Sequence, residues 1–231
     1  MARAVIFDMD GVLVDSEPLH LRVTRDVLGP AATESTDATA REFIGRTVSD
    51  MLDTLIRRHG LPGRLAVYEA RYDARLMELL AQPRAPREGA VWLLAELHRR
   101  GCRLGIASSS NQTWIDAMLH SLDLSGRFDA AVGADTVARP KPAPDVYLTA
   151  AERLEVPSGE CIAVEDSPAG VQAARAAGMT VIGLVTPDVD PARLRAAHRL
   201  IRSLLEFPLD QIGSRRPIVR APDAPPCAEP P

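Results

Sequence analysis

The sequence predicts an α/β protein with a doubly wound parallel sheet and a small α-helical lobe inserted after the first strand. Short apolar runs, typical of buried strands, alternate with helix-period segments over most of the chain. This alternation indicates a parallel sheet that is covered by helices on both faces. Between about residues 16 and 81, helical patterns follow one another without a strand-like run, which indicates the inserted lobe.

The predicted strands are five short segments dominated by apolar side chains. Each is only a few residues long, as expected for strands that are buried on both faces. They span residues 4–7, 103–107, 130–132, 161–164 and 180–185.

Four helices are predicted between these strands, each from a stripe of apolar side chains with the helical period. They span residues 88–100, 112–122, 145–156 and 169–177. The last has the clearest boundaries. Ser167 is a suitable N-cap, Pro168 suits the first helical position, and Gly178 ends the helix.

The inserted lobe is expected to contain three helices, at residues 17–28, 47–59 and 64–80, and the proline-spaced segment 82–86 is expected to be the return linker. We therefore expect residues 1–15 and 83–217 to form the α/β core and residues 16–82 to form the lobe. The proline-rich residues 218–231 are expected to be a disordered tail.

The composition disfavours several classes of protein. The net charge of −4 gives no basic field for nucleic acid or an anionic membrane surface. The three cysteines show no CxxC spacing, and no apolar stretch approaches the length of a membrane span. The first residues reach an acidic side chain too early for a signal peptide. We therefore expect a cytoplasmic protein without nucleic-acid or membrane partners.

Three predicted strands end in polar residues. Asp8 and Asp10 follow the first strand, Ser108 to Ser110 follow the second, and Glu165 and Asp166 follow the strand at 161–164. In open parallel sheets, ligand groups gather at the carboxyl ends of the strands, near a switch in strand order. The sequence therefore predicts a single site at this edge.

The charges of this predicted site call for a cation. Four carboxylates, from Asp8, Asp10, Glu165 and Asp166, cannot all ionise close together without compensation. Ligands that are all oxygen favour a hard ion, and Mg²⁺ suits a site that also receives a phosphate oxygen. Lys141, held between two prolines, is expected to supply a second positive charge.

These residue types favour phosphoryl transfer. A carboxylate can attack phosphorus and form an aspartyl-phosphate, and Asp8 fits this role. Asp10 fits a general acid that protonates the leaving oxygen and then a base that deprotonates water. Ser108, the neighbouring backbone N–H groups and Lys141 fit a cradle for the phosphate oxygens.

The same segments resemble, in order and spacing, the four motifs of the haloacid dehalogenase-like hydrolase superfamily, and the likeness covers residues 3–186. The inserted lobe is similar to the small helical cap of the branch that includes β-phosphoglucomutase and sugar-phosphate phosphatases. The segments are Asp8-Met9-Asp10-Gly11-Val12, Ile106-Ala107-Ser108-Ser109-Ser110, Lys141-Pro142-Ala143-Pro144-Asp145 and Val164-Glu165-Asp166-Ser167-Pro168.

The resemblance implies a Rossmann-like core, a magnesium cofactor and roles for the site residues. Asp8 would be the nucleophile, and Asp10 would be the general acid/base with its backbone carbonyl on the metal. Asp166, with Glu165 nearby, would bind the metal. The phosphate would be bound by Ser108, Ser109 and Lys141. Dehalogenases generally lack the second aspartate, so Asp10 disfavours dehalogenation.

The resemblance also gives candidates for contacts to the rest of the substrate. His20 and Arg75 lie near cap positions where the mutase carries a histidine and a lysine. His20 is equally compatible with an ordinary, partly exposed helix residue. Arg46 is a candidate to meet an anionic substrate from the cap. Ser110 and Asn111 are the candidates from the core.

Phosphatase, mutase and non-catalytic binding module remain alternatives. Asn111 replaces a lysine that often follows the serine motif, and the mutase's cap arginine has no clean match here. These departures favour a phosphatase acting on a sugar or polyol phosphate, as a monomer or weak homodimer. A non-catalytic module would lack a working residue, and none of the five residues that such a site needs is missing. They are Asp8, Asp10, Ser108, Lys141 and Asp166.

Overall fold

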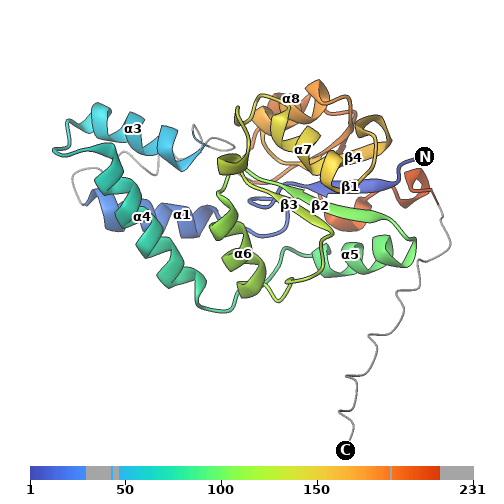
Figure 1. The fold of residues 1–231 in the computed structure, drawn as a ribbon, viewed down its shortest axis with the longest axis horizontal. Helices are drawn as coiled ribbons and strands as arrows, with labels where there is room; N and C mark the ends of the chain where they lie inside the picture. The colour runs from blue at the N-terminus through green and yellow to red at the C-terminus, as the bar shows by residue number, and fades with distance from the viewer. Residues whose placement is uncertain (30–42, 44–46, 188, 214–231) are drawn as a thin grey trace, which may run out of the picture.

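A parallel six-stranded sheet forms the centre of the computed structural model, which describes residues 1–29, 43, 47–187 and 189–213. The strand order is β3-β2-β1-β4-β5-β6, and neighbouring strands are parallel throughout (Figure 1). The strands are β1 (Ala4–Phe7), β2 (Arg103–Ala107), β3 (Ala130–Val132), β4 (Cys161–Glu165), β5 (Thr180–Leu184) and β6 (Arg199–Ile201).

Helices cover both faces of the sheet, as Figure 1 shows. Val5 and Phe7 of β1 belong to one apolar cluster, with α5 (Ala90–Arg99) and α6 (Gln112–Ser121). Ala4 and Ile6 belong to the cluster on the other face, with α7 (Asp145–Arg153) and α8 (Pro168–Ala176). Side chains of successive strand residues point to opposite faces, so β1 contributes to both clusters. The doubly wound α/β fold is confirmed.

The helical lobe lies between β1 and β2 in the chain and to one side of the sheet in Figure 1. It consists of α1 (Glu17–Leu28), α3 (Val48–His59) and α4 (Leu65–Leu80), and both α1 and α3 pack on α4. The lobe contacts the core where α4 meets α6. There, the Tyr72 and Trp114 ring centroids are 5.7 Å apart, and Trp114 Nε1 donates a 2.6 Å hydrogen bond to Asp73 Oδ1.

All five predicted strands and all seven predicted helices are present, with boundaries that shift by a few residues at most. The largest shift is in α7, which was expected to reach residue 156 and ends at Arg153. Glu155 adopts a left-handed backbone conformation with φ of 56°, which cannot continue a helix. Short 3₁₀ turns join the elements at Ala134–Thr136, Ser158–Glu160, Pro191–Leu194, Leu204–Glu206 and Leu209–Gln211.

The sheet topology determines where the strand ends meet. The chain runs from β1 outward to β2 and β3, then returns to β4 on the other side of β1, so strand order switches between β1 and β4. Phe7 pairs with both Ile106 and Val164, so the next residue along β1, Asp8, lies level with the ends of β2 and β4. Binding sites in doubly wound folds form at this kind of switch.

Two further expectations from the sequence concern membrane-spanning helices and the C-terminal tail. No helix among the described residues is long and apolar enough to cross a membrane. The expected tail, residues 218–231, lies outside the described residues.

Candidate active site

Three buried carboxylates meet at the switch between β1 and β4. Oxygens of Asp8, Glu165 and Asp166 all lie within 4.8 Å of one another. Asp8 is held at the end of β1 by its backbone N–H, which donates a 2.9 Å hydrogen bond to the Val164 carbonyl of β4. The expectation that strand ends bring these side chains together is therefore met for three of the four predicted carboxylates.

Lys141 enters this cluster from the loop before α7 and is buried in it. Its Nζ donates to Asp8 Oδ1 at 3.0 Å, to Glu165 Oε1 at 2.6 Å and to the Ala107 carbonyl at 2.9 Å. Burial opposes the charge of Lys141, but the two carboxylates outweigh burial and raise its pKa above the usual value. The lysine therefore stays protonated and links the ends of β1, β2 and β4.

Glu165 is held mainly by protein donors. Besides Lys141, Oε1 accepts from Tyr147 Oη at 2.7 Å, while Oε2 accepts from the Ser167 N–H at 3.1 Å and the Ser167 hydroxyl at 3.0 Å. A Cβ at Gly170 would overlap this carboxylate, so glycine leaves the room it needs. Because its oxygens already have these partners, Glu165 is better placed to orient the cluster than to supply a main metal ligand.

Asp166 is packed against the loop that follows β1. Gly11 has a left-handed backbone with φ of 76°, and a Cβ there would overlap the Asp166 carboxylate. Among the described residues, no hydrogen-bond donor contacts the Asp166 carboxylate. This leaves its oxygens for a ligand that the protein itself does not provide.

The cluster has one cation for three carboxylates. Burial first, and then the charge of Glu165, raise the pKa of Asp8 to about 8. Burial and the charge of Asp8 likewise raise the pKa of Asp166 well above its usual range. A divalent ion would remove this imbalance. Carboxylate oxygens that all lie within 4.8 Å of one another are close enough to share one such ion.

Asp10 points away from this cluster toward the helical lobe. Its Oδ1 accepts from the Ser16 hydroxyl at 2.6 Å and lies 3.4 Å from His20 Nε2, and its Oδ2 accepts from the Ser110 hydroxyl at 2.9 Å. Burial alone would raise the pKa of Asp10, but these hydrogen bonds and the charge of His20 lower it to about 2. The carboxylate of Asp10 faces the lobe, so Asp10 would bind a metal through its backbone carbonyl.

His20 connects Asp10 to the interior of the lobe. Its Nδ1 forms a 2.7 Å hydrogen bond with Tyr72 Oη, and Tyr72 is fully buried in α4. Burial lowers the pKa of His20, but its hydrogen bond to Asp10 and the charges of Asp10 and Glu17 raise it above the usual value. Burial also raises the pKa of Tyr72, so its hydroxyl keeps its proton. In the sequence Tyr72 follows the apolar period of its helix, which gives no sign of this contact with His20.

The hydroxyl of Tyr72 is therefore expected to position His20. Tyr72→Phe should lower kcat for phosphate-ester hydrolysis by about tenfold to 100-fold, because loss of a hydrogen bond to a charged group costs about 1.5–3 kcal/mol. Steady-state kinetics measures this change. Tyr68→Phe is the matched control, because Tyr68 on the same helix donates a 2.7 Å hydrogen bond to the Pro62 carbonyl instead. Equal loss of kcat in both variants would assign Tyr72 a structural role alone.

The serine motif follows β2 at the same edge of the sheet. Ser108 is buried, and its hydroxyl accepts a 3.0 Å hydrogen bond from the Ser110 N–H. Asn111 caps α6, since its Oδ1 accepts from the Trp114 N–H at 2.8 Å. The structure thus gives Ser110 a contact to Asp10 and gives Asn111 a capping role, while Ser108 directly follows Ala107, whose carbonyl accepts from Lys141.

Two other residues of the lobe, Arg75 and Arg46, were also predicted to contact the substrate. Arg75 does not reach the acidic cluster: its Nε donates to Asp26 Oδ2 at 2.7 Å and its Nη1 to Glu78 Oε2 at 2.6 Å. The pair with Asp26 joins α4 to α1, and the pair with Glu78 lies within α4. Arg46 lies outside the described residues.

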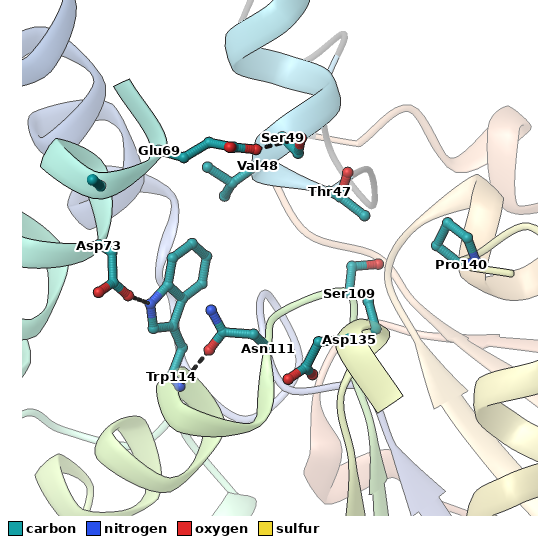
Figure 2. Close-up of a pocket in the computed structure, with 12 residues that line it drawn as sticks. Thr47, Val48, Ser49, Glu69, Asp73, Ser109, Asn111, Trp114, Asp135 and Pro140 are labelled. Atoms are coloured by element: carbon teal, nitrogen blue, oxygen red, sulfur yellow. Dashed lines mark hydrogen bonds between the residues drawn. The ribbon is translucent and has the colours of Figure 1, made fainter. Parts of the chain in front are cut away.

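A cavity of about 490 Å³ opens between the lobe and the core (Figure 2), a volume typical of small-molecule sites. It brings together residues of α3 and α4 from the lobe with the serine motif and the segment before α7 from the core. The lining residues are Thr47, Val48, Ser49, Glu69, Ala70, Asp73, Ser109, Asn111, Trp114, Ala134, Asp135 and Pro140.

The raised pKa of Asp8 predicts how the metal-free protein responds to pH. In the unfolded chain this carboxyl loses its proton near pH 3.8, but in the folded protein only near pH 8. Between these two pH values the folded protein holds one more proton than the unfolded chain. The free energy of unfolding therefore falls as the pH rises toward 8. Urea unfolding in the presence of EDTA should show a lower free energy of unfolding at pH 8 than at pH 5.

Two controls isolate the origin of this pH dependence. Mg²⁺ should raise the stability at pH 8 more than at pH 5, because it binds the ionised carboxylates. Asp8→Asn should reduce the difference between the two pH values. A metal-free protein that is equally stable at both pH values would show that the cluster is not strained by its charge.

A family model, a related sequence and a solved structure each match most of this chain. The family model described as haloacid dehalogenase-like hydrolase matches residues 5–184. Hexitol phosphatase B of Escherichia coli K12 is 34% identical over 212 residues, which cover 88% of this chain and 93% of that protein. The structure of CbbY from Rhodobacter sphaeroides in complex with phosphate superposes with a TM-score of 0.79 at 28% identity and covers 92% of this chain and 99% of that one.

A longer relative contains a similar segment. Protein SUPPRESSOR OF QUENCHING 1, chloroplastic, from Arabidopsis thaliana is 37% identical over 203 residues, which cover 86% of this chain but only 19% of that protein.

Proposed function

The chain belongs to the family of haloacid dehalogenase-like hydrolases, and we propose that it is a phosphatase that hydrolyses a small phosphorylated sugar or polyol through an aspartyl-phosphate on Asp8. The observation that carries this proposal is the buried meeting of Asp8, Lys141 and Asp166 at the switch in strand order. Similarity to hexitol phosphatase B supports the class of substrate.

In the first step, an oxygen of Asp8 would attack phosphorus, forming an acyl phosphate while the bond between phosphorus and the ester oxygen breaks. The leaving oxygen needs a proton. Asp10 would deliver this proton, because its carboxylate faces the lobe. Because Asp10 is ionised in the free site, His20 beside it would hold this proton and pass it through Asp10. In the second step, Asp10 would take a proton from the water that attacks phosphorus, which releases phosphate and restores Asp8.

The remaining residues of the site would bind and orient. Lys141, 3.0 Å from Asp8, would bind an oxygen of the transferring group, and Ser108, Ser109 and the N–H groups of their turn would hold the others. We propose that Mg²⁺ is held by Asp8, Asp166 and the Asp10 carbonyl, with Glu165 orienting Asp8 and Lys141 around it. When bound, the ion would neutralise the negative charge that gathers between phosphate and nucleophile.

We further propose that the lobe, residues 16–82, acts as the cap of the core formed by residues 1–15 and 83–217. The Tyr72–His20–Asp10 contacts and the Asp73–Trp114 hydrogen bond link the two parts directly. A cap in place would therefore both orient Asp10 and exclude bulk water from the acyl phosphate. We also propose that the enzyme is cytoplasmic, that it is a monomer or a weak homodimer, and that it has no nucleic-acid or membrane partner.

Phosphate release from a panel of esters tests this function. 4-Nitrophenyl phosphate and several hexose and hexitol phosphates should release inorganic phosphate in the presence of Mg²⁺ and lose this activity in EDTA. Incubation with β-glucose 1-phosphate separates the alternatives: a mutase would form glucose 6-phosphate with little free phosphate. A preparation that binds Mg²⁺ but hydrolyses no ester of the panel would contradict the proposal.

A further inference from the structure

The cavity between lobe and core is lined by acidic side chains. Glu69 and Asp73 come from α4, and Asp135 comes from the 3₁₀ turn after β3. None of the described residues that line the cavity is a lysine, an arginine or a histidine. On the lobe side, Val48 contributes an apolar side chain. The part of the wall formed by described residues therefore carries negative charge and no cation.

Hydrogen bonds hold these three carboxylates in place, and every donor is neutral. Glu69 Oε1 accepts from the Ser49 hydroxyl at 2.6 Å, Asp73 Oδ1 from Trp114 Nε1 at 2.6 Å, and Asp135 Oδ1 from the Gln112 N–H at 2.9 Å. The first two are visible in Figure 2. No ion pair to any of the three is formed within the described residues, so no cationic side chain there cancels their charges.

The rest of the lining suits a polyhydroxylated molecule. Thr47, Ser49, Ser109 and Asn111 bring hydroxyl and amide groups, and the Trp114 ring forms part of the wall (Figure 2). Hydroxyl groups can donate to carboxylate oxygens and accept from such side chains. A phosphate or carboxylate group would instead lie near three like charges in a partly closed space.

We infer that this cavity selects the organic part of the ester by charge. It accepts a neutral polyol or one that carries a protonated amine, and it rejects one that carries a second phosphate or a carboxylate. Glu69, Asp73 and Asp135 are the specificity-determining residues. This inference rests on the proposed function, because it assigns the leaving group of that reaction to the cavity.

Three esters with the same chain length test it: glucitol 6-phosphate, glucosamine 6-phosphate and 6-phosphogluconate. They present a neutral, a cationic and an anionic leaving group. We expect kcat/KM for 6-phosphogluconate to be at least about 100-fold below that for glucitol 6-phosphate, and glucosamine 6-phosphate to be at least as good as glucitol 6-phosphate. Hydrolysis of 6-phosphogluconate within threefold of glucitol 6-phosphate would overturn the inference.

Two further measurements separate this inference from the proposed function. Turnover of 4-nitrophenyl phosphate reports the function itself. Calorimetric binding of the three esters to Asp8→Asn protein with Mg²⁺ gives a ranking that does not depend on turnover. If 6-phosphogluconate binds as tightly as glucitol 6-phosphate, charge selection fails even when the aryl phosphate is hydrolysed.

Neutralised variants locate the selection. Asp73→Asn and Asp135→Asn keep a hydrogen-bond acceptor for Trp114 and Gln112. Each should raise kcat/KM for 6-phosphogluconate relative to glucitol 6-phosphate by about tenfold and lower it for glucosamine 6-phosphate relative to glucitol 6-phosphate. Opposite changes in two ratios cannot come from a general folding defect.

A matched control lies on the neighbouring helix. Asp116 of α6 accepts from Gln112 Nε2 at 3.0 Å and does not line the cavity. Asp116→Asn should leave both ratios within twofold. Ratios that stay fixed in the Asp73 and Asp135 variants, or that move in the same direction, would contradict the assignment of these residues.

Discussion

Asp8→Asn is expected to lower kcat for phosphate-ester hydrolysis by on the order of 10⁴-fold or more, because an amide oxygen does not attack phosphorus. The substitution keeps the shape of the side chain and the contact with Lys141 through the amide oxygen. Loss of activity would therefore reflect the lost nucleophile. Single-turnover and steady-state assays with 4-nitrophenyl phosphate measure the effect.

The same variant should not be less stable when metal is absent. Burial and the neighbouring Glu165 already disfavour the charge on Asp8, so its removal relieves repulsion within the cluster. Thermal unfolding in EDTA at pH 8 should give a Tm equal to or above that of the wild type. Asp15→Asn is the control, because Asp15 is exposed on the same loop, and it should retain activity within about threefold. Activity of Asp8→Asn above about one per cent of wild type would rule out this nucleophile.

Lys141→Met should have the largest combined effect on activity and stability. The variant leaves Asp8 and Glu165 buried without their shared cation, which typically destabilises a protein by about 3–5 kcal/mol. It also removes a donor to the transferring group, which should lower kcat by about 10²- to 10³-fold. Urea unfolding and steady-state kinetics measure the two effects.

Arg139→Met is the matched control for Lys141→Met. Arg139 lies two residues away, and its side chain is 71% exposed where it pairs with Asp145. Removal of such an exposed ion pair should cost no more than about 1 kcal/mol. If both variants lose the same stability, Lys141 is not the centre of a buried charge cluster.

The sequence predicted the acidic cluster because the fold itself brings strand ends together. In a parallel sheet, residues that follow neighbouring strands must lie at the same edge, so the order of strands and helices was enough to group Asp8, Glu165 and Asp166. The N-cap role of Ser167 was also predicted and is confirmed, because capping depends on local sequence.

Features that depend on contacts between distant segments could not be predicted in the same way. The direction of Asp10 is set by hydroxyls of Ser16 and Ser110, one of which lies a hundred residues away. Tyr72 and Trp114 carry the apolar period of their helices, which hides their polar contacts to His20 and Asp73.

Arg75 and β6 show two further limits. Arg75 was matched to a substrate position by its place in the chain, but its pairing with Asp26 depends on how α1 packs on α4. β6 has only three residues, and two of them are exposed, so its pattern is too short to mark a strand.

A crystal structure with Mg²⁺ and beryllium fluoride tests the central claim most directly, because beryllium fluoride mimics a phosphoryl group on a carboxylate. The account predicts a fluoride complex on an oxygen of Asp8, in contact with Lys141, and one Mg²⁺ that is bound by both Asp8 and Asp166. A metal bound without Asp166, or a fluoride complex on any other side chain, would contradict it.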